Sequence, residues 1–593
     1  MNAFTHSHEP IIISYHNTSG EFQLYRFIMC VSVRQGQLLL RPLIQYLLTL
    51  VTAMDLFVVL AIGTIVLLIY HYVSQKYHYF LAKPIPCLKP TFLLGSSGPA
   101  LFRKRDIATH FRLIYNTHPD SKLIGFYDFT SPSYLVRDPD VIKKIGVKDF
   151  DFFTDHTPLV PADETATGEV GEESLFLNTL FALRGQKWRD MRATLSPAFT
   201  GSKMRHMFQL VAECARSMNG FFAAEAKTGK RLECEMKDTF SRFSNDVIAT
   251  VAFGIQVNSL KERDNEFYAA GKEMVNFQSF TIIMKFMLMA FAPRLMKKLK
   301  IDFLSSKLKK YFKEMILDNM KQRNVHGIVR NDMIDILMQV QKGVLEHQKN
   351  EKETKDAGFA TVEESAVGKS TNSRVWTENE LIAQCLLFFL AGFETVSTCM
   401  TFLTYELLAN RDVQDRLHRE IQETEHSLNG VPLSYEVLLR MPYMDMVVSE
   451  ALRLWPPAVF SERSCSKNYL YDDGAGTRFT IEKGRTLLIP SFAIHRDSKY
   501  WERPDQFDPE RFSEENRSKI NPAAYIPFGI GPRNCIGSRL ALMEVKLIVY
   551  YLLRDFSLEP TEKSEIPLKL KKVMFAMIPE SGVWLEVKPR REP

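Results

Sequence analysis

The sequence has few cysteines, and none of them are paired. Eight cysteines are spread over 593 residues without a C-x-x-C motif. Zinc clusters need such closely spaced thiols, and small secreted disulfide folds need a denser framework. The spacing therefore excludes both classes and indicates thiols in a reducing compartment. A cysteine with a chemical role here has to act alone.

A charge excess is also missing. The 75 Lys and Arg residues nearly balance the 69 Asp and Glu residues, which gives a formal net charge of +6. A dedicated nucleic-acid-binding protein has a much larger basic excess, so we expect no nucleic-acid partner. The hydrophobic fraction of 46% is that of a globular protein. The 42 Phe and 24 Met residues suit either a large core or an adaptable apolar pocket.

One apolar run is long enough to cross a bilayer. Residues 56–73, LFVVLAIGTIVLLIYHYV, carry no Asp, Glu, Lys or Arg, and about 20 apolar residues span a hydrocarbon core. The small residues of a signal-peptide cleavage site do not follow the run. Basic residues follow instead, so we predict a retained membrane anchor over 54–75, with the rest of the chain in the cytosol. A stiff proline-rich linker is predicted over 76–92.

The residues before this anchor do not fit it. Residues 1–53 contain a second apolar run and basic residues on the wrong side of the membrane. We therefore interpret 1–53 as an upstream extension or an artefact of the gene model, with translation starting at Met54. A mitochondrial presequence is the alternative, and Glu9 and Glu21 disfavour it.

The remaining residues, 93–593, are predicted to form one catalytic domain. Apolar residues three and four apart predict helices over most of it, including a long apolar helix from Trp376 to about Leu408. Alternating segments at 479–482 and 486–489 predict short strands. The polar stretch 342–374 predicts a mobile surface loop. The fold class is thus mainly α with small β-sheets.

The strongest chemical signal is a glycine-rich loop that contains a single cysteine. Residues 528–537 read FGIGPRNCIG, and a helix is predicted to begin at Ile536. Gly529 and Gly531 permit a tight turn and a close approach of the backbone to a flat group. A cysteine at a helix N-terminus has its thiolate stabilised by unpaired N–H groups and the helix dipole. The alternative is a buried inert cysteine, which is disfavoured because all five fixed places of F-x-x-G-x-R-x-C-x-G are filled.

This decamer resembles the haem-binding loop of the cytochromes P-450. The resemblance implies haem b (iron protoporphyrin IX) with Cys535 as axial ligand of the iron. Phe528 and Gly537 would lie beside the haem, and Arg533 would offer a bidentate cation to a haem propionate.

Two more motifs are similar to haem-contacting elements of this family. Trp188 and Arg192 form W-x-x-x-R and resemble the pair that reaches the propionates, with core packing as the alternative for Trp188. Arg463 stands where a further propionate-binding arginine is often found. The basic residues near these positions predict a face that docks an acidic electron donor, with ordinary solubilising charge as the alternative: Arg184, Lys187, Arg189, Arg539 and Lys546.

The long apolar helix contains an acid followed by an alcohol. Residues 391–395 read AGFET and resemble the oxygen-activation groove of the family. Glu394 and Thr395 suit proton delivery to bound dioxygen. The alternative is a packing kink at Gly392, with Glu394 facing solvent.

A third motif concerns folding. Glu450 and Arg453, three residues apart, lie on one helix face as an ion pair. With Arg511 they are similar to the Glu–Arg–Arg lock of the family, which serves folding and haem retention and not turnover. A solvated surface pair is the alternative, disfavoured by the apolar residues around it.

Within this family the chain looks most like insect microsomal members, near the vertebrate drug-metabolising branch. The stretches 356–361 (DAGFAT) and 375–378 (VWTE) are similar to the ninth insect family in particular. The resemblance implies an endoplasmic reticulum enzyme that faces the cytosol and inserts one oxygen atom of O2 into lipophilic small molecules. Xenobiotics and insecticides are the expected substrates, or else an endogenous hormone or lipid. Electrons would come from NADPH through NADPH-cytochrome P-450 reductase, or from a cytochrome b-type donor.

Two functions of other classes remain as alternatives. One is a haem-thiolate isomerase or dehydratase, which the Glu394–Thr395 pair disfavours because such chemistry needs no protons delivered to O2. The other is a non-catalytic haem- or lipid-binding membrane protein. The apolar segment 279–299 is expected either to dip into the membrane or to form a buried helix pair.

Overall fold

We describe a computed structural model of the chain, which covers residues 36–157, 174–276, 279–299, 301–330, 332–342, 358–369 and 374–590. The chain divides into two units, Met1–Tyr72 and Val73–Pro593. Helix α1 (Gly36–Tyr77) is continuous through Met54. Within it and the turn that follows, Leu56–Ala82 is long and apolar enough to cross a membrane, which confirms the predicted apolar helix.

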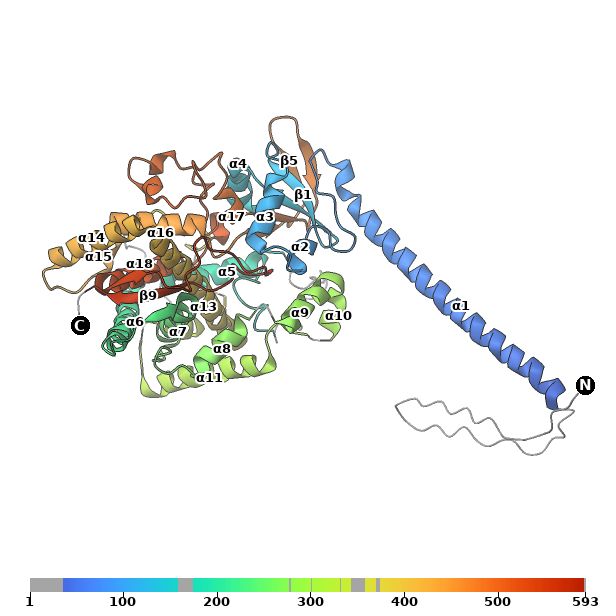
Figure 1. Ribbon diagram of the computed structural model, residues 1–593, viewed down its shortest axis with the longest axis horizontal. Helices are drawn as coiled ribbons and strands as arrows, with labels where there is room; N and C mark the ends of the chain where they lie inside the picture. Colours follow the sequence, from blue (N-terminus) through green and yellow to red (C-terminus); the bar gives the residue numbers. More distant parts are fainter. Residues whose placement is uncertain are drawn as a thin grey trace, which may run out of the picture. The chain divides into compact units, whose positions relative to one another are not determined.

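The second unit is mainly helical, as predicted. Its longer helices are α3 (Ile107–Asn116), α5 (Gly185–Leu195), α6 (Gly201–Ala226), α7 (Met236–Phe253), α8 (Glu266–Met274), α9 (Phe280–Phe291), α11 (Ser306–His326), α12 (Met333–Gln341), α13 (Glu378–Ala409), α14 (Arg411–Leu428), α16 (Pro442–Leu454) and α18 (Ser538–Asp555). The shorter ones are α2 (Gly98–Leu101), α4 (Pro139–Lys143), α10 (Pro293–Lys298), α15 (Tyr435–Leu439) and α17 (Ser491–Ile494) (Figure 1).

Small sheets complete this unit. One sheet has the order β1-β2-β7-β4, with β2 and β7 parallel, another has the order β3-β9-β8, and β5 and β6 form a hairpin. The predicted strands at 479–482 and 486–489 correspond to β6 and β7. The strands are β1 (Leu123–Asp128), β2 (Ser131–Val136), β3 (Glu233–Glu235), β4 (Ser461–Ser464), β5 (Tyr469–Asp472), β6 (Arg478–Ile481), β7 (Thr486–Ile489), β8 (Phe556–Glu559) and β9 (Trp584–Pro589).

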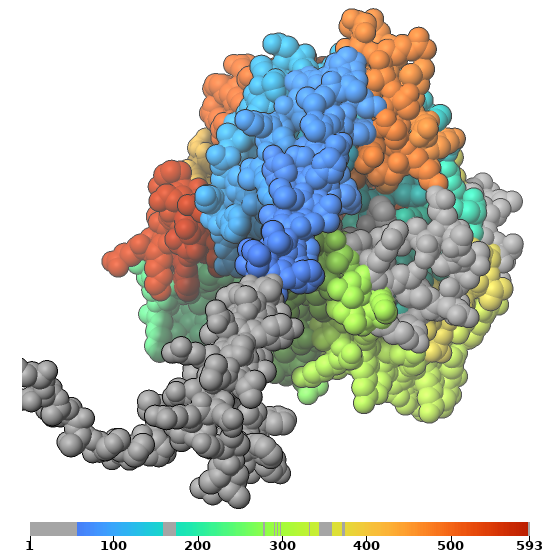
Figure 2. Space-filling view, turned by 90° about the vertical axis from the view of Figure 1, so that its right-hand side faces the viewer, coloured from blue at the N-terminus to red at the C-terminus, as the bar shows by residue number. Residues whose placement is uncertain are grey.

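Aromatic contacts join the first sheet to the β5–β6 hairpin. Tyr134 of β2 stacks on Phe479 of β6, with 5.9 Å between ring centroids. Figure 2 shows the blue residues of the N-terminal part of this unit beside the orange residues of the hairpin. Segments more than 300 residues apart in sequence therefore share one hydrophobic cluster.

Helix α13 is the core helix of the unit. A capping box fixes its start, because the Thr377 side chain accepts from the Glu380 N–H while the Glu380 carboxylate accepts from the Thr377 N–H. A Cβ placed on Gly392 would lie 2.7 Å from the Cδ1 atom of Ile248 on α7. Gly392 thus allows α13 and α7 to pack closely, while the helix continues to Ala409.

The described part of the predicted mobile loop is packed against the protein. Residues 343–357 and 370–373 lie outside the described residues. In the piece 358–369, Ala360 is buried. The centroid of the Phe359 ring lies 5.1 Å from that of Phe512 and 5.4 Å from that of Tyr525. This piece differs from a solvent-exposed loop because its few apolar residues find a place in the core.

Helix α9 exposes apolar side chains. Phe280 is 75% exposed and Met284 48% exposed, and further exposed apolar residues follow at Phe291, Leu295 and Leu299. This exposure contradicts the expected alternative of a buried helix pair. It agrees with an apolar surface of the kind that lies at a membrane interface.

We predict that Phe389 carries much of the stability of this core. Its fully buried ring contacts Phe253, Phe267 and Phe312, so Phe389→Ala removes a large apolar volume and should lower the free energy of unfolding by about 3–5 kcal/mol. Denaturant unfolding in detergent measures this loss. Val375→Ala, at a side chain that is 88% exposed, is the control and should change stability by at most about 0.5 kcal/mol. A loss below ~1 kcal/mol for Phe389→Ala would contradict the prediction.

Candidate functional site

The loop that carries Cys535 is shaped by two glycines. Gly529 and Gly531 have φ angles of +77° and +72°, which L side chains rarely adopt. A Cβ on Gly531 would overlap the carbonyl oxygen of Gly146, so the close approach that we expected for a flat group is here to backbone. The Cys535 N–H donates to the Phe528 carbonyl at 2.9 Å and closes the loop.

Cys535 precedes the helix by three residues. Helix α18 starts at Ser538 with Gly537 as its N-cap, two residues later than predicted. Desolvation by the surrounding protein raises the pKa of the Cys535 thiol, even though its side chain is exposed, while the Gly537 N–H and the Arg192 cation oppose this rise. The stabilised thiolate that we expected from the helix terminus is thus not the dominant effect. Metal coordination deprotonates a thiol outright, so a bound iron would supply the missing stabilisation.

The Cys535 side chain is exposed, although Asn534 and Ser538 beside it are buried. Helix α13 also has exposed positions, since Ala391 and Thr395 are exposed although most of the helix is buried. The Phe199 ring joins the two elements. It contacts the ring of Phe388 on α13 at 5.9 Å, and a Cβ on Gly537 would lie 3.9 Å from it. The Phe199 ring therefore links the segment that carries the exposed thiol to α13.

Two buried polar atoms near this loop have no hydrogen-bond partner. They are Nε of Arg463, whose side chain is fully buried, and Nδ1 of His156. Burial lowers the pKa of Arg463 to about 10 and holds the pKa of His156 well below its usual value. Both groups would gain from a neighbouring anion that accepts hydrogen bonds. Carboxylates such as haem propionates have this chemistry, so these residues fit the implied group.

Arg533 is fixed by protein atoms. Its guanidinium donates to the carbonyls of Thr154 and Leu183 at 2.7 Å each and lies 3.3 Å from a carboxylate oxygen of Asp155. It also lies 4.0 Å above the ring of Trp188, which is 1% exposed. Burial lowers the pKa of Arg533 to about 9. Trp188 and Arg533 therefore form one packed unit at the Cys535 loop.

Arg192 lies on the same helix as Trp188 but has different partners. It donates to the Asn534 carbonyl at 2.8 Å and pairs with the Glu364 carboxylate at 2.7 Å. The sequence predicted a propionate contact for Arg192. The structure places its guanidinium instead against the residue that precedes Cys535.

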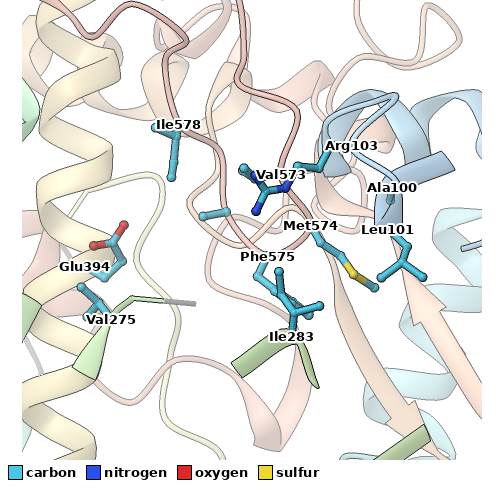
Figure 3. A pocket seen from close by; sticks show the side chains of 11 residues that line it. Ala100, Leu101, Arg103, Val275, Ile283, Glu394, Val573, Met574, Phe575 and Ile578 are labelled. Carbon is cyan, nitrogen blue, oxygen red and sulfur yellow. The ribbon is translucent and has the colours of Figure 1, made fainter. Parts of the chain in front are cut away.

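Glu394 and Thr395 lie on different sides of α13. The Glu394 carboxylate pairs with Lys237 Nζ at 2.9 Å, and that ammonium also donates to Ser397 and Thr398. Figure 3 shows Glu394 on the wall of a pocket, opposite the segment that contains Phe575. The Thr395 hydroxyl donates to the Ala391 carbonyl at 2.6 Å.

The predicted lock is assembled. Glu450 and Arg453 are fully buried and form two hydrogen bonds at 2.7 and 2.8 Å. Arg511 lies 3.3 Å from the same carboxylate, and the Asp508 N–H donates to it at 2.9 Å. With both carboxylate oxygens engaged, the desolvated charge of Glu450 is compensated.

His495 connects this lock to Ile526, two residues before the Cys535 loop, and no motif in the sequence pointed to this histidine. Its Nδ1 bonds to the Arg453 carbonyl at 3.1 Å, and its Nε2 accepts from the Ile526 N–H at 2.9 Å. These bonds require the neutral Nδ1–H tautomer. Burial, aided by Arg453, lowers the pKa of His495 to about 3.

The predicted basic face is neutralised at several of its members. Lys546 is fully buried and pairs with Asp445 at 2.8 Å, so its assignment as a docking cation was wrong. Lys187 pairs with Glu380. Arg189 pairs with Asp151 at 2.7 Å.

Residues 97–585 match a protein-family model described as Cytochrome P450. The chain is 42% identical over 543 residues to Cytochrome P450 9e2 of Blattella germanica, an alignment that covers 89% of this chain and 97% of that protein. It is 40% identical over 523 residues to Probable cytochrome P450 9f2 of Drosophila melanogaster, with 88% and 97% covered. Cytochrome P450 6k1 of Blattella germanica is 33% identical, with 89% and 96% covered.

The lock gives a stability prediction. Arg453→Ala leaves the Glu450 carboxylate buried without its main partner, so the free energy of unfolding should fall by about 3–5 kcal/mol. Arg517→Ala removes an exposed partner of Glu514 in the same stretch of chain and should cost at most about 1 kcal/mol. Urea unfolding of both variants beside the unchanged protein measures the two losses. Equal losses would show that Glu450 does not depend on Arg453.

His495 gives a pH prediction. Its folded pKa lies below the unfolded value of 6.5, so the unfolded chain binds the extra proton and stability is lost as pH falls below 6.5 toward about 3. Between pH 7 and 5.5 this loss is about 1 kcal/mol. His495→Asn should lack it, so the stability difference between the unchanged protein and the variant narrows by that amount on acidification. A constant difference across this range would contradict the assignment.

Proposed function

Because the chain belongs to the cytochrome P450 family, we propose that it is a membrane-bound haem-thiolate monooxygenase. It would insert one oxygen atom of O2 into lipophilic small molecules, with electrons from NADPH delivered by NADPH-cytochrome P-450 reductase or a cytochrome b-type donor. The observation that carries the proposal is a lone accessible thiol on a glycine-shaped loop next to an accessible face of the core helix. When bound, haem b supplies the iron chemistry that activates dioxygen.

Cys535 would be the axial ligand of the iron. Among the described residues no group of three or more His, Cys, Asp or Glu side chains could hold a metal ion, which suits an iron held by a porphyrin and one thiolate. Arg463 would donate to a propionate, since its buried Nε has no partner. Phe528 and Gly537 would flank the ring.

Glu394 and Thr395 would move protons across α13. Glu394 lines the pocket on one side of the helix, and Thr395 lies on its accessible face. Lys237 Nζ lies 2.9 Å from the Glu394 carboxylate and also donates to Ser397 and Thr398, so these contacts hold the acid in place. The Thr395 hydroxyl, already donating to a carbonyl, offers its oxygen as an acceptor.

Substrates would be apolar. Leu387, Ala391 and Thr395 follow one another at intervals of four on the accessible face of α13, and Ala458 is exposed as well. We expect xenobiotics and insecticides as the substrate class, or else endogenous hormones or lipids. The candidate membrane helix and the apolar surface of α9 support residence at the endoplasmic reticulum membrane, where lipophilic molecules collect.

A difference spectrum tests the thiolate ligand. The reduced, CO-treated protein should show a Soret band near ~450 nm. Cys535→Ala should abolish it, and Cys87→Ala, at a thiol elsewhere in the fold, should retain it. A well-folded protein without this band would refute the thiolate.

Turnover assays distinguish a monooxygenase from the two alternative functions. With reductase and a panel of lipophilic compounds, NADPH consumption should depend on substrate and yield oxygenated product. Conversion of a lipid hydroperoxide without reductase, and none with NADPH, would favour an isomerase instead. No substrate-dependent NADPH consumption would favour a non-catalytic haem protein.

The proton path gives its own prediction. Glu394→Gln removes the acid but keeps the side-chain shape, so product formation should fall by about 10²-fold while the CO band persists. Thr401→Val is the matched control, because this buried hydroxyl lies further along α13 and bonds only within the helix. Product formation should change little in the control. Unchanged product formation in Glu394→Gln would exclude this acid from the path.

A further inference from the structure

The packed segment 358–369, hereafter the strap, lies against three elements that the proposed function uses. It contacts α16 through Asp445, the Cys535 loop through Asn534, and α5 through Arg192. The monooxygenase reaction assigns no role to the strap. Its contacts nevertheless converge on the residue that precedes the proposed iron ligand.

The first end of the strap is firmly held. The Phe359 N–H donates to one oxygen of Asp445 at 2.9 Å, and the buried ammonium of Lys546 donates to the other at 2.8 Å. Gly358 has a φ angle of +105°, and a Cβ there would collide with the Asp445 carboxylate. Ala360 is buried beyond it. A segment fixed in this way can hold the carboxylate of Glu364, further along the strap, in a defined position.

The middle of the strap encloses Asn534. The Glu363 carbonyl accepts from Asn534 Nδ2 at 3.2 Å. Arg192 donates to the Asn534 carbonyl at 2.8 Å and to its side-chain oxygen at 2.7 Å. Glu364 holds Arg192 by two contacts, at 2.7 and 3.2 Å.

The charges of this network are weakly screened. The Arg192 side chain is 3% exposed and the Glu364 side chain 20% exposed. Charges in such surroundings act on a neighbouring group far more strongly than exposed charges do. Arg192 contacts the carbonyl and the side chain of Asn534, the residue before Cys535, and Glu364 holds Arg192, so both charges lie next to the proposed iron ligand.

We propose that Glu364 is a positioning residue that sets the reduction potential of the haem iron, by holding Arg192 beside Asn534 and offsetting its charge. The inference rests on the proposed haem-thiolate function. One-electron reduction of ferric to ferrous haem adds one negative charge to the site. A carboxylate nearby opposes that charge, and a guanidinium favours it.

Glu364→Gln should therefore raise the potential. We expect the equilibrium for one-electron reduction to shift by about tenfold toward the ferrous state, which is ~59 mV. Spectroelectrochemical titration of the membrane-extracted holoenzyme measures it. Glu363→Gln is the matched control, because it removes the same charge from the adjacent, exposed position on the strap. Its shift should be less than about a third of that in Glu364→Gln.

The double variant Arg192→Gln/Glu364→Gln separates charge from structure. It removes both charges. Its potential should therefore differ from that of the unchanged protein by no more than about a third of the shift expected for Glu364→Gln. A potential that stays raised would show that lost strap contacts, and not charge, cause the effect, and would overturn the proposal. Equal shifts in Glu364→Gln and Glu363→Gln would overturn it too.

Separate controls distinguish a folding defect in the variants from a failure of the proposed function. If Glu364→Gln does not retain haem, Glu364→Thr supplies a second neutral side chain, with the same expected rise. Hydrogen exchange at Phe359, whose N–H bonds to Asp445, reports whether the strap stays docked in each variant. An unchanged protein without the band near ~450 nm would refute the proposed function. A normal band with an unshifted potential in the neutral variants would refute only the role of Glu364.

Discussion

The buried carboxylate of Glu450 is the constraint on which the site depends. Taking a charge out of water costs several kcal/mol unless its partners replace the lost hydration. Arg453, Arg511 and the Asp508 N–H do so, and the chain after α17 has to fold around α16 to bring them there. The Cys535 loop leaves from this same stretch. His495 bonds to Arg453 of the lock and to Ile526, two residues before the loop, so the position of the loop depends on the buried charge pair.

The core helix supplies the opposite side of the site. Gly392 brings α13 and α7 close together, and the ring of Phe389 fills the space beside them. This packing buries most of α13, while Ala391 and Thr395 stay exposed. Adjacent residues of a helix point about 100° apart. Glu394 and Thr395 can therefore serve two different environments from neighbouring positions, one facing Lys237 and one facing the accessible space.

The sequence predicted those parts of the site whose residues all lie within a short motif. The Cys535 loop, the Glu450–Arg453 pair and the acid–alcohol pair each need fixed residue types at fixed spacing. Other parts depend on partners far apart in sequence, such as Lys237 and Glu394, 157 residues apart, or Arg192 and Glu364, 172 residues apart. No local pattern encodes such a contact.

At the strap and at the basic face, the average composition predicted exposed polar residues, but individual contacts determine where these residues lie. The stretch 342–374 is polar on average, yet the burial of Ala360 and the ring contacts of Phe359 decide where its described part lies. Lys546 looks like a surface cation in sequence, yet it is buried against Asp445, which in turn holds the strap. Paired charges lose most of their long-range field. The side of the protein next to Cys535 thus presents ion pairs where the sequence suggested an excess of cations, and an acidic electron donor would have to compete with Glu364, Glu380 and Asp151 for them.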